Sequence, residues 1–75
     1  MEKMIIFGNE LQAQKIISRI NNYNGELLST DLLDDDVMND VFTENTVYVA
    51  ADDSREQILL SNGVSRDKII NFSLF

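Results

Sequence analysis

Hydrophobic residues occur along the chain in short runs that alternate with helical spacings, a pattern typical of an α/β fold. Residues 4–7 form a continuous apolar run, Met-Ile-Ile-Phe, that ends at Gly8. Such a run indicates a central parallel strand buried on both faces. Four apolar residues then share one helical face at the spacing i, i+3, i+4, i+7: Ala13, Ile16, Ile17 and Ile20. Residues 4–20 therefore predict a strand, a tight turn and a helix.

The polar residues of this stretch fit the same prediction. Asn9 is a good helix cap, and Gln12 stands three positions later, as in a capping box. Lys15 and Arg19 fall on the polar side of the helix, toward water. Residues 21–25, which are rich in Asn and end in Gly, are expected to end the helix.

The middle of the chain predicts two further strands with an acidic helix between them. Residues 26–30 form a short candidate strand, and residues 46–51, Thr-Val-Tyr-Val-Ala-Ala, carry the strongest strand signal in the chain. Residues 33–43 predict a short amphipathic helix whose carboxylates gather near its positive N-terminal end.

The last third predicts a helix followed by a strand. Residues 54–61 are the helix, with Asp53 and Glu56 or Ser54 and Gln57 as the capping pair. The Asn-Gly pair at 62–63 ends it, and the valine that follows can make the apolar contact typical of such an end. Residues 69–72 are the last strand.

Strands that alternate with helices form a parallel sheet with right-handed crossovers. The predicted fold is a minimal three-layer Rossmann-like α/β sandwich with four parallel strands in the order 2-1-3-4 and helices on both faces. We expect one domain over residues 1–75, which could be a piece of a longer protein. In this strand order a crevice opens at the C-terminal ends of the first and third strands. The residues expected around it are Gly8, Asn9, Glu10, Asp31, Ala51, Asp52 and Asp53.

Composition excludes several chemistries. The chain has no Cys and no His, which removes thiol nucleophiles, disulfides, the commonest general base and the commonest metal ligand. A net charge of −7 opposes binding to nucleic acid, because phosphates are repelled. No apolar run approaches the roughly 18 residues of a membrane span, so we expect no membrane partner and a cytoplasmic protein.

The chain is apolar up to its last residue. We expect either that a larger protein continues here or that Leu74 and Phe75 fold back onto the domain or a partner. An edge strand of so small a sheet can also pair with a second copy. The sequence therefore predicts a weak homodimer or contact with an attached or partner enzyme domain.

The opening Met4-Ile-Ile-Phe-Gly-Asn-Glu-Leu-Gln-Ala13 resembles the strand-turn-helix of small Rossmann-like domains attached to sugar-modifying enzymes. These enzymes include FkbM-type methyltransferases, nucleotide-sugar dehydratases and epimerases, and sugar acyltransferases. Residues 47–57 and 62–72 are similar to the closing strand-helix-strand of such domains. The resemblance implies a Rossmann-like fold and an accessory role beside such an enzyme.

One position departs from the pattern of that family. Its turn carries glycines at the first and third positions and glycine or alanine at the sixth, where this chain has Gly8, Glu10 and Ala13. Glu10 replaces the glycine that lets the backbone approach a pyrophosphate, and it adds a like charge that repels an anion by ~1 kcal/mol at 4 Å in water. We therefore expect no cofactor, with NAD and nucleotide-sugars disfavoured by Glu10. Asp31 nevertheless follows Gly8 at close to the roughly 20 residues that separate the turn from the ribose-binding acid.

Each candidate site has a structural alternative. The turn at residues 8–10 is either a capped turn or a ligand site, and Asp31 either ends a strand or binds a ribose. Residues 34–36, all Asp, are a solvated helix start rather than a metal site, because they lack the spacing of a calcium loop. Asp52 and Asp53 are helix caps or, in the other interpretation, an acid pair without a visible partner base.

Three hypotheses for the function follow. The first is a non-catalytic accessory or protein-interaction domain derived from a nucleotide-binding fold and connected with sugar or polysaccharide modification. The second is a small-ligand module that recognises a nucleotide or nucleotide-sugar through Gly8, Asn9 and Asp31. An enzyme in its own right is the third and the least favoured.

Overall fold

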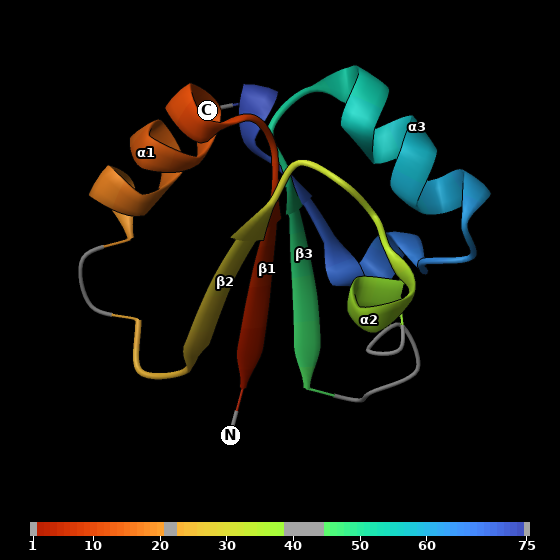
Figure 1. The fold of residues 1–75 in the computed structure, drawn as a ribbon, viewed down its shortest axis with the longest axis horizontal. Helices are drawn as coiled ribbons and strands as arrows, with labels where there is room; N and C mark the ends of the chain where they lie inside the picture. Colours follow the sequence, from red (N-terminus) through yellow and green to blue (C-terminus); the bar gives the residue numbers. More distant parts are fainter. Residues whose placement is uncertain (1, 21–22, 39–44, 75) are drawn as a thin grey trace.

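Four parallel strands form one sheet in the order β2-β1-β3-β4, which confirms the predicted topology. The computed structural model describes residues 2–20, 23–38 and 45–74, without the side chains of residues 35, 36 and 74. In chain order the elements are β1 (Lys3–Phe7), α1 (Glu10–Arg19), β2 (Glu26–Thr30), α2 (Asp35–Met38), β3 (Thr46–Ala50), α3 (Asp53–Ser61) and β4 (Ile69–Asn71). Two 3₁₀ turns, η1 (Arg66–Lys68) and η2 (Phe72–Leu74), lie on either side of β4 (Figure 1).

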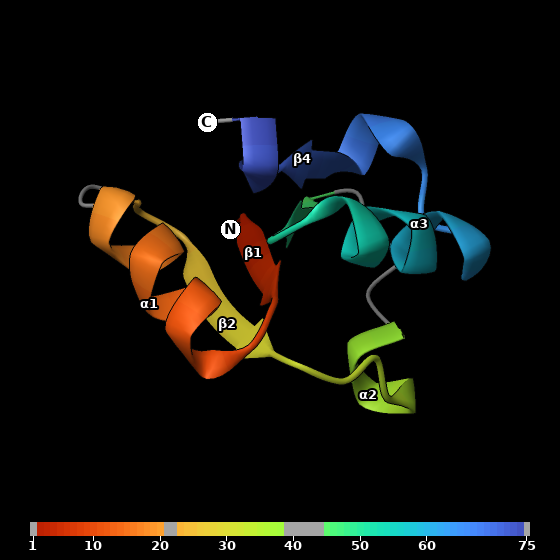
Figure 2. The same ribbon diagram turned by 90° about the horizontal axis from the view of Figure 1, so that it is seen from above.

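The fold has three layers, because α1 covers one face of the sheet and α3 covers the other (Figure 2). The cluster under α1 consists of Ile6, Ala13, Ile16 and Val49. The cluster under α3 consists of Ile5, Phe7, Tyr48, Ala50, Leu59 and Val64, with α2 packed against its edge. Burying each large aliphatic side chain contributes about 2 kcal/mol to stability. Both faces of the sheet are therefore part of the core.

The two central strands supply both clusters. Ile5 pairs with Tyr48 and Ile6 pairs with Val49 across β1 and β3. Because neighbouring residues of a strand point to opposite faces, the first pair enters the α3 cluster and the second enters the α1 cluster. Tyr48 also donates a hydrogen bond of 3.2 Å from its hydroxyl to the carbonyl of Val37, which ties α2 to the sheet.

Helix α1 begins as predicted, but its apolar face is only partly buried. The capping box between Asn9 and Gln12 is present. Ile16 is buried, whereas Ile17 is 41% exposed. Ile17 faces a hollow beside Ser29 at the end of β2, which is an edge strand of the sheet.

Two elements differ from their predicted bounds. Helix α2 begins at Asp35, two residues later than predicted, with Asp34 accepting a hydrogen bond of 2.9 Å from the Val37 amide, and residues 39–43 of the predicted helix lie outside the described residues. Strand β4 stops at Asn71 because its side-chain oxygen accepts a 2.9 Å hydrogen bond from the amide of Ser73, which turns the chain into η2. The predicted fold-back of residues 74–75 also lies outside the description.

Helix α3 is capped by Asp52, which confirms one of the predicted caps, and not by either of the two predicted pairs. The Asp52 carboxylate accepts from the Arg55 amide. The C-terminus is as predicted, since the Val64 amide donates to the Leu59 carbonyl and the Gly63 amide donates to Leu60, both over 3.1 Å. This arrangement is a Schellman motif, and it buries Val64 against the α3 cluster.

Among the described residues, no helix is long and apolar enough to cross a membrane.

Replacing Gly63 with alanine should lower the free energy of unfolding by about 1 kcal/mol, because the residue has a φ of +92° and a left-handed residue with a Cβ is strained. No atom lies within 4 Å of the Cβ that alanine would add, so only the backbone conformation is tested. Urea unfolding measures the change. The matched variant Gly63→Asn should lower the free energy of unfolding by less, since Asn tolerates this conformation. Equal losses for both variants would contradict this explanation.

Candidate functional site

The candidate site lies where β1 and β3 end side by side and the chain passes to helices on opposite faces of the sheet. Gly8 is buried at the end of β1. A Cβ at this position would lie 2.7 Å from the Cβ of Ala51, so only glycine fits. The Gly8 amide donates to the Thr30 carbonyl over 3.0 Å, and the Ala51 amide donates to the Phe7 carbonyl over 3.0 Å. Gly8 thus allows the strand ends to meet closely, which leaves little space for a ligand between them.

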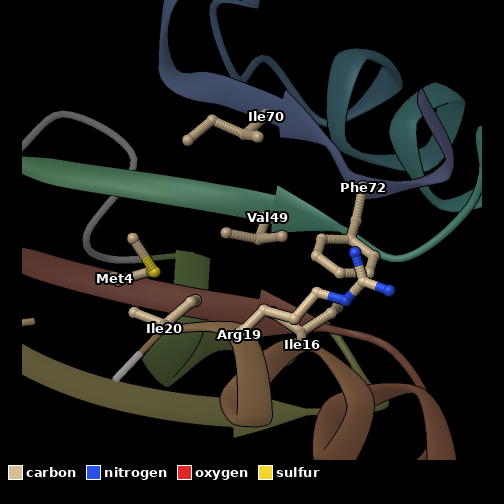
Figure 3. A pocket seen from close by; sticks show the side chains of 7 residues that line it. All are labelled: Met4, Ile16, Arg19, Ile20, Val49, Ile70 and Phe72. Carbon is tan, nitrogen blue, oxygen red and sulfur yellow. The ribbon is translucent and has the colours of Figure 1, made fainter. Parts of the chain in front are cut away.

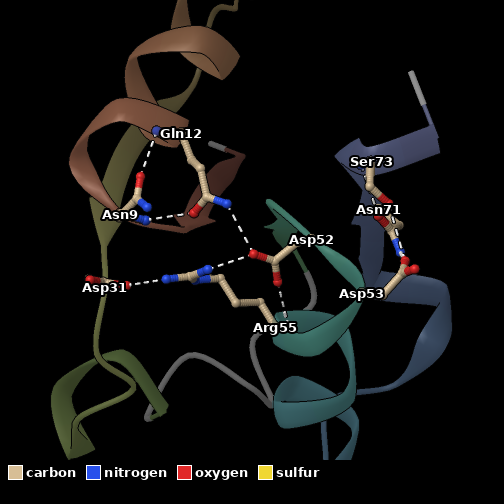
Figure 4. A network of polar contacts seen from close by, with 8 residues as sticks. All are labelled: Asn9, Gln12, Asp31, Asp52, Asp53, Arg55, Asn71 and Ser73. Carbon is tan, nitrogen blue, oxygen red and sulfur yellow. Dashed lines mark hydrogen bonds and ion pairs between the residues drawn. The ribbon is translucent and has the colours of Figure 1, made fainter.

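The cap of α1 reaches across this junction. The Asn9 side chain accepts from the Gln12 amide over 2.8 Å, and the Asn9 amide donates to the Gln12 side chain over 2.9 Å. The free amide group of Gln12 then donates to Asp52 over 3.0 Å (Figure 4). Gln12 therefore links the start of α1 to the start of α3.

Arg55, in the first turn of α3, joins two of the predicted acids. Its Nη1 donates to Asp52 over 2.6 Å, and its Nη2 donates to Asp31 over 2.7 Å. Its guanidinium carbon lies 5.5 Å from the ring centre of Phe7, within the range of a cation–π contact. Arg55 is thus held by β1, by the end of β2 and by its own helix cap.

These contacts shift the pKa values of Asp52 and Arg55. The hydrogen bond from Gln12, followed by the backbone amide of Arg55, holds the pKa of Asp52 below its ordinary value. The hydrogen bond with Asp31, with further support from Asp52, raises the pKa of Arg55. Both groups therefore keep their charges, which makes Asp52 a poor general base near neutral pH.

Asp53 faces away from the junction. Its carboxylate accepts from the side chain of Asn71 over 2.7 Å and from the hydroxyl of Ser73 over 3.1 Å (Figure 4). Glu56 joins the same group through Asn71 and through an ion pair of 2.8 Å with Arg66. The two predicted acids therefore have different partners. Asp52 contacts Gln12 and Arg55 at the crevice, whereas Asp53 links α3 to β4 through Asn71.

Glu10 and Asp31 both line a hollow between α1 and β2. This hollow has a volume of about 300 Å³ and is lined by Gly8, Glu10, Ala13, Gln14, Ile17, Ser29, Thr30 and Asp31. Its size is at the lower limit of ligand pockets. Glu10 is exposed at the first turn of α1, and it brings a negative charge to this hollow.

The chemistry of this region is limited by its charges. Within the described residues, no group of three or more Asp or Glu side chains could hold a metal ion, and the side chains at 35 and 36 of the acidic run lie outside that description. Arg55 is the cation nearest the acids of the crevice, and two carboxylates already occupy it. A phosphate would have to displace one of them.

Arg55 and Gln12 were not assigned to the site from the sequence, where Gln12 was expected only to cap α1. The spacing of Asp52 and Arg55 indicates a local pair, but no sequence pattern relates Arg55 to Asp31 on a different strand. Comparisons of the chain with protein-family models, with curated proteins and with solved structures give no match.

Replacing Asp52 with asparagine should remove part of the pH dependence of stability while keeping a competent helix cap. Because folding lowers the pKa of Asp52, its contribution is complete above pH about 5 and is lost as the pH falls through its unfolded value of about 3.9 and below. We expect Asp52→Asn to cost about 1 kcal/mol at pH 7 and progressively less under acidic conditions. Urea unfolding across this pH range measures the difference.

The control is Asp67→Asn, at an exposed residue of η1. It makes the same change of charge away from Gln12 and Arg55. A deficit of Asp52→Asn that stays constant down to acidic pH, or one that Asp67→Asn reproduces, would rule out the assigned role of Asp52.

Proposed function

We propose that this chain is a non-catalytic accessory or protein-interaction domain derived from a nucleotide-binding fold. The observation that carries the proposal is the network that joins Gln12, Asp52, Arg55 and Asp31 across the crevice. In a ligand-binding relative of such a fold, this is the place where a ligand lies against the strand ends. Here side chains of the domain itself fill the hydrogen-bonding positions.

The electrostatics of the crevice support the same proposal. Asp31 and Asp52 outnumber Arg55, and Glu10 adds a further negative charge at the start of α1. The helix N-terminus that favours anions is therefore opposed by nearby carboxylates. A pyrophosphate gains little here, since Arg55 already has two carboxylate partners.

The sequence resemblance suggests the setting of the interaction. We infer that the partner is an enzyme of sugar or polysaccharide modification, of the kinds to which similar small domains are attached. A cytoplasmic location belongs to the same proposal. The coding sequence around residues 1–75 gives an independent check, because a transferase, dehydratase or epimerase domain in the same reading frame would support an accessory role.

The second candidate is a module that binds a nucleotide or nucleotide-sugar. The hollow of about 300 Å³ beside Gly8, Glu10 and Asp31 favours it, because it brings together three of the residues predicted for such a site. Asp31 would then exchange its contact with Arg55 for a ribose hydroxyl. That exchange breaks an ion pair in which Asp31 is 56% exposed and Arg55 is 20% exposed.

A titration of the labelled protein with NAD, S-adenosylmethionine and UDP-glucose separates the two candidates. If the crevice is closed, amide chemical shifts should stay unchanged at millimolar ligand. Localised shifts at residues 8–11 and at Asp31 would instead establish the ligand-binding module.

A companion variant tests the part played by Glu10. Glu10→Gly should gain affinity only if this side chain blocks an ancestral site, and Glu10→Gln separates the effect of charge from that of bulk. If neither variant binds the ligands, Glu10 is not what blocks a nucleotide site in this domain.

Weak self-association through the edge strand β2 is part of the interaction proposal. Within the part of the chain that the structure describes, its outer edge has no partner strand, and Leu28 on it is 41% exposed. We expect the mean mass measured by light scattering to rise above that of a monomer at high protein concentration, and Leu28→Lys to prevent the rise. A monomer mass throughout the concentration range would contradict the proposed homodimer.

A further inference from the structure

An apolar groove lies on the opposite side of the sheet from α3, between α1 and β4. It has a volume of about 290 Å³ and is lined by Met4, Ile16, Arg19, Ile20, Val49, Ile70 and Phe72 (Figure 3). All of these residues except Arg19 are apolar. Strand β4 contributes Ile70, which pairs with Val49 in the register and is 40% exposed. This groove is separate from the crevice at the strand ends.

The groove exists because one helix lies over this face of a four-stranded sheet. Helix α1 packs against β1 and leaves part of β3 and β4 without a helix above it (Figure 2). A parallel sheet is normally covered on both faces, since its strands are apolar on both sides. This uncovered strip therefore presents apolar side chains to water. Covering them with an apolar ligand lowers the free energy of the complex.

One cation, Arg19, lines this groove, and a second, Lys15, lines a hollow beside it. The guanidinium of Arg19 lies 5.8 Å from the ring centre of Phe72, so these two residues meet across the end of the groove. Among the described residues, no carboxylate forms an ion pair with Arg19. Lys15, one turn earlier on α1, lines an adjoining hollow that shares Ile16 and Phe72 with the groove. The groove therefore combines an apolar floor with a positive end, in a chain whose net charge is −7.

We propose that this groove binds a small carboxylate with an apolar tail. The tail lies along Met4, Val49 and Ile70, and the carboxylate meets Arg19. A volume of about 290 Å³ accommodates roughly ten heavy atoms, taking about 30 Å³ for each as for liquid water. Octanoate has this size.

The probes are straight-chain carboxylates from butanoate to octanoate, titrated into the labelled protein. Shifts should be confined to the methyl groups of Met4, Ile16 and Ile70 and to the side chain of Arg19. Each added methylene should tighten the Kd by roughly two- to fourfold, up to the length that fills the groove. Octanoate should bind about fivefold more tightly than 1-octanol, as a partly exposed ion pair contributes about this factor.

Variants separate the positive end from the apolar floor. Arg19→Met keeps an apolar stem, so it should reduce octanoate binding to the level of octanol, whereas Arg19→Lys should retain most of the preference for the anion. Arg66→Met makes the same change of charge at a residue that pairs with Glu56, and it should leave octanoate binding unchanged. Ile70→Glu places a carboxylate in the apolar part of the groove and should weaken octanoate binding at least tenfold, with the fold verified by the amide spectrum.

Three results would overturn the proposal. The first is the absence of localised shifts at millimolar octanoate, and the second is equal binding of octanoate and octanol. The third is binding of octanoate at Gly8 and Asp31 instead of the groove. None of these outcomes depends on whether the crevice accepts nucleotides, so the groove and the proposed function are tested separately.

Discussion

The fold depends on the pairing of β1 with β3, because alternate residues of these two strands belong to the two apolar clusters on opposite faces of the sheet. Ile5 and Tyr48 face α3, while Ile6 and Val49 face α1. A substitution in either strand therefore affects a cluster that holds a helix in place. The same constraint brings the strand ends together at Gly8, and this close approach determines what the crevice can hold.

Polar side chains complete the junction at those strand ends. Asp52 serves as the cap of α3 and as an acceptor for both Gln12 and Arg55, so one carboxylate orients two helices. Arg55 stacks on Phe7 and reaches Asp31, which adds the end of β2 to the network. A region that binds ligands in many α/β folds is here used to hold the domain together.

The two faces of the sheet differ in how completely they are covered. Helix α3 and the short α2 close one face, where Tyr48 and Leu59 are fully buried. On the other face α1 leaves the strip around Val49 and Ile70 open, with Arg19 at its end. The arginine of the crevice, Arg55, is by contrast paired with two carboxylates.

The sequence by itself determined the fold, because local signals agreed along the chain. The apolar run before Gly8, the capping box of α1 and the Schellman end of α3 each depend on residues a few positions apart. The sequence also placed Gly8, Asp31 and Asp52 at one edge of the sheet, since parallel strands end together. Only the tertiary structure decided what these residues do. Arg55 contacts Asp31, and Arg19 contacts Phe72, although the residues of each pair are far apart in the sequence. No local pattern predicts such contacts, so the polar network at the crevice and the apolar groove were visible only in the tertiary structure.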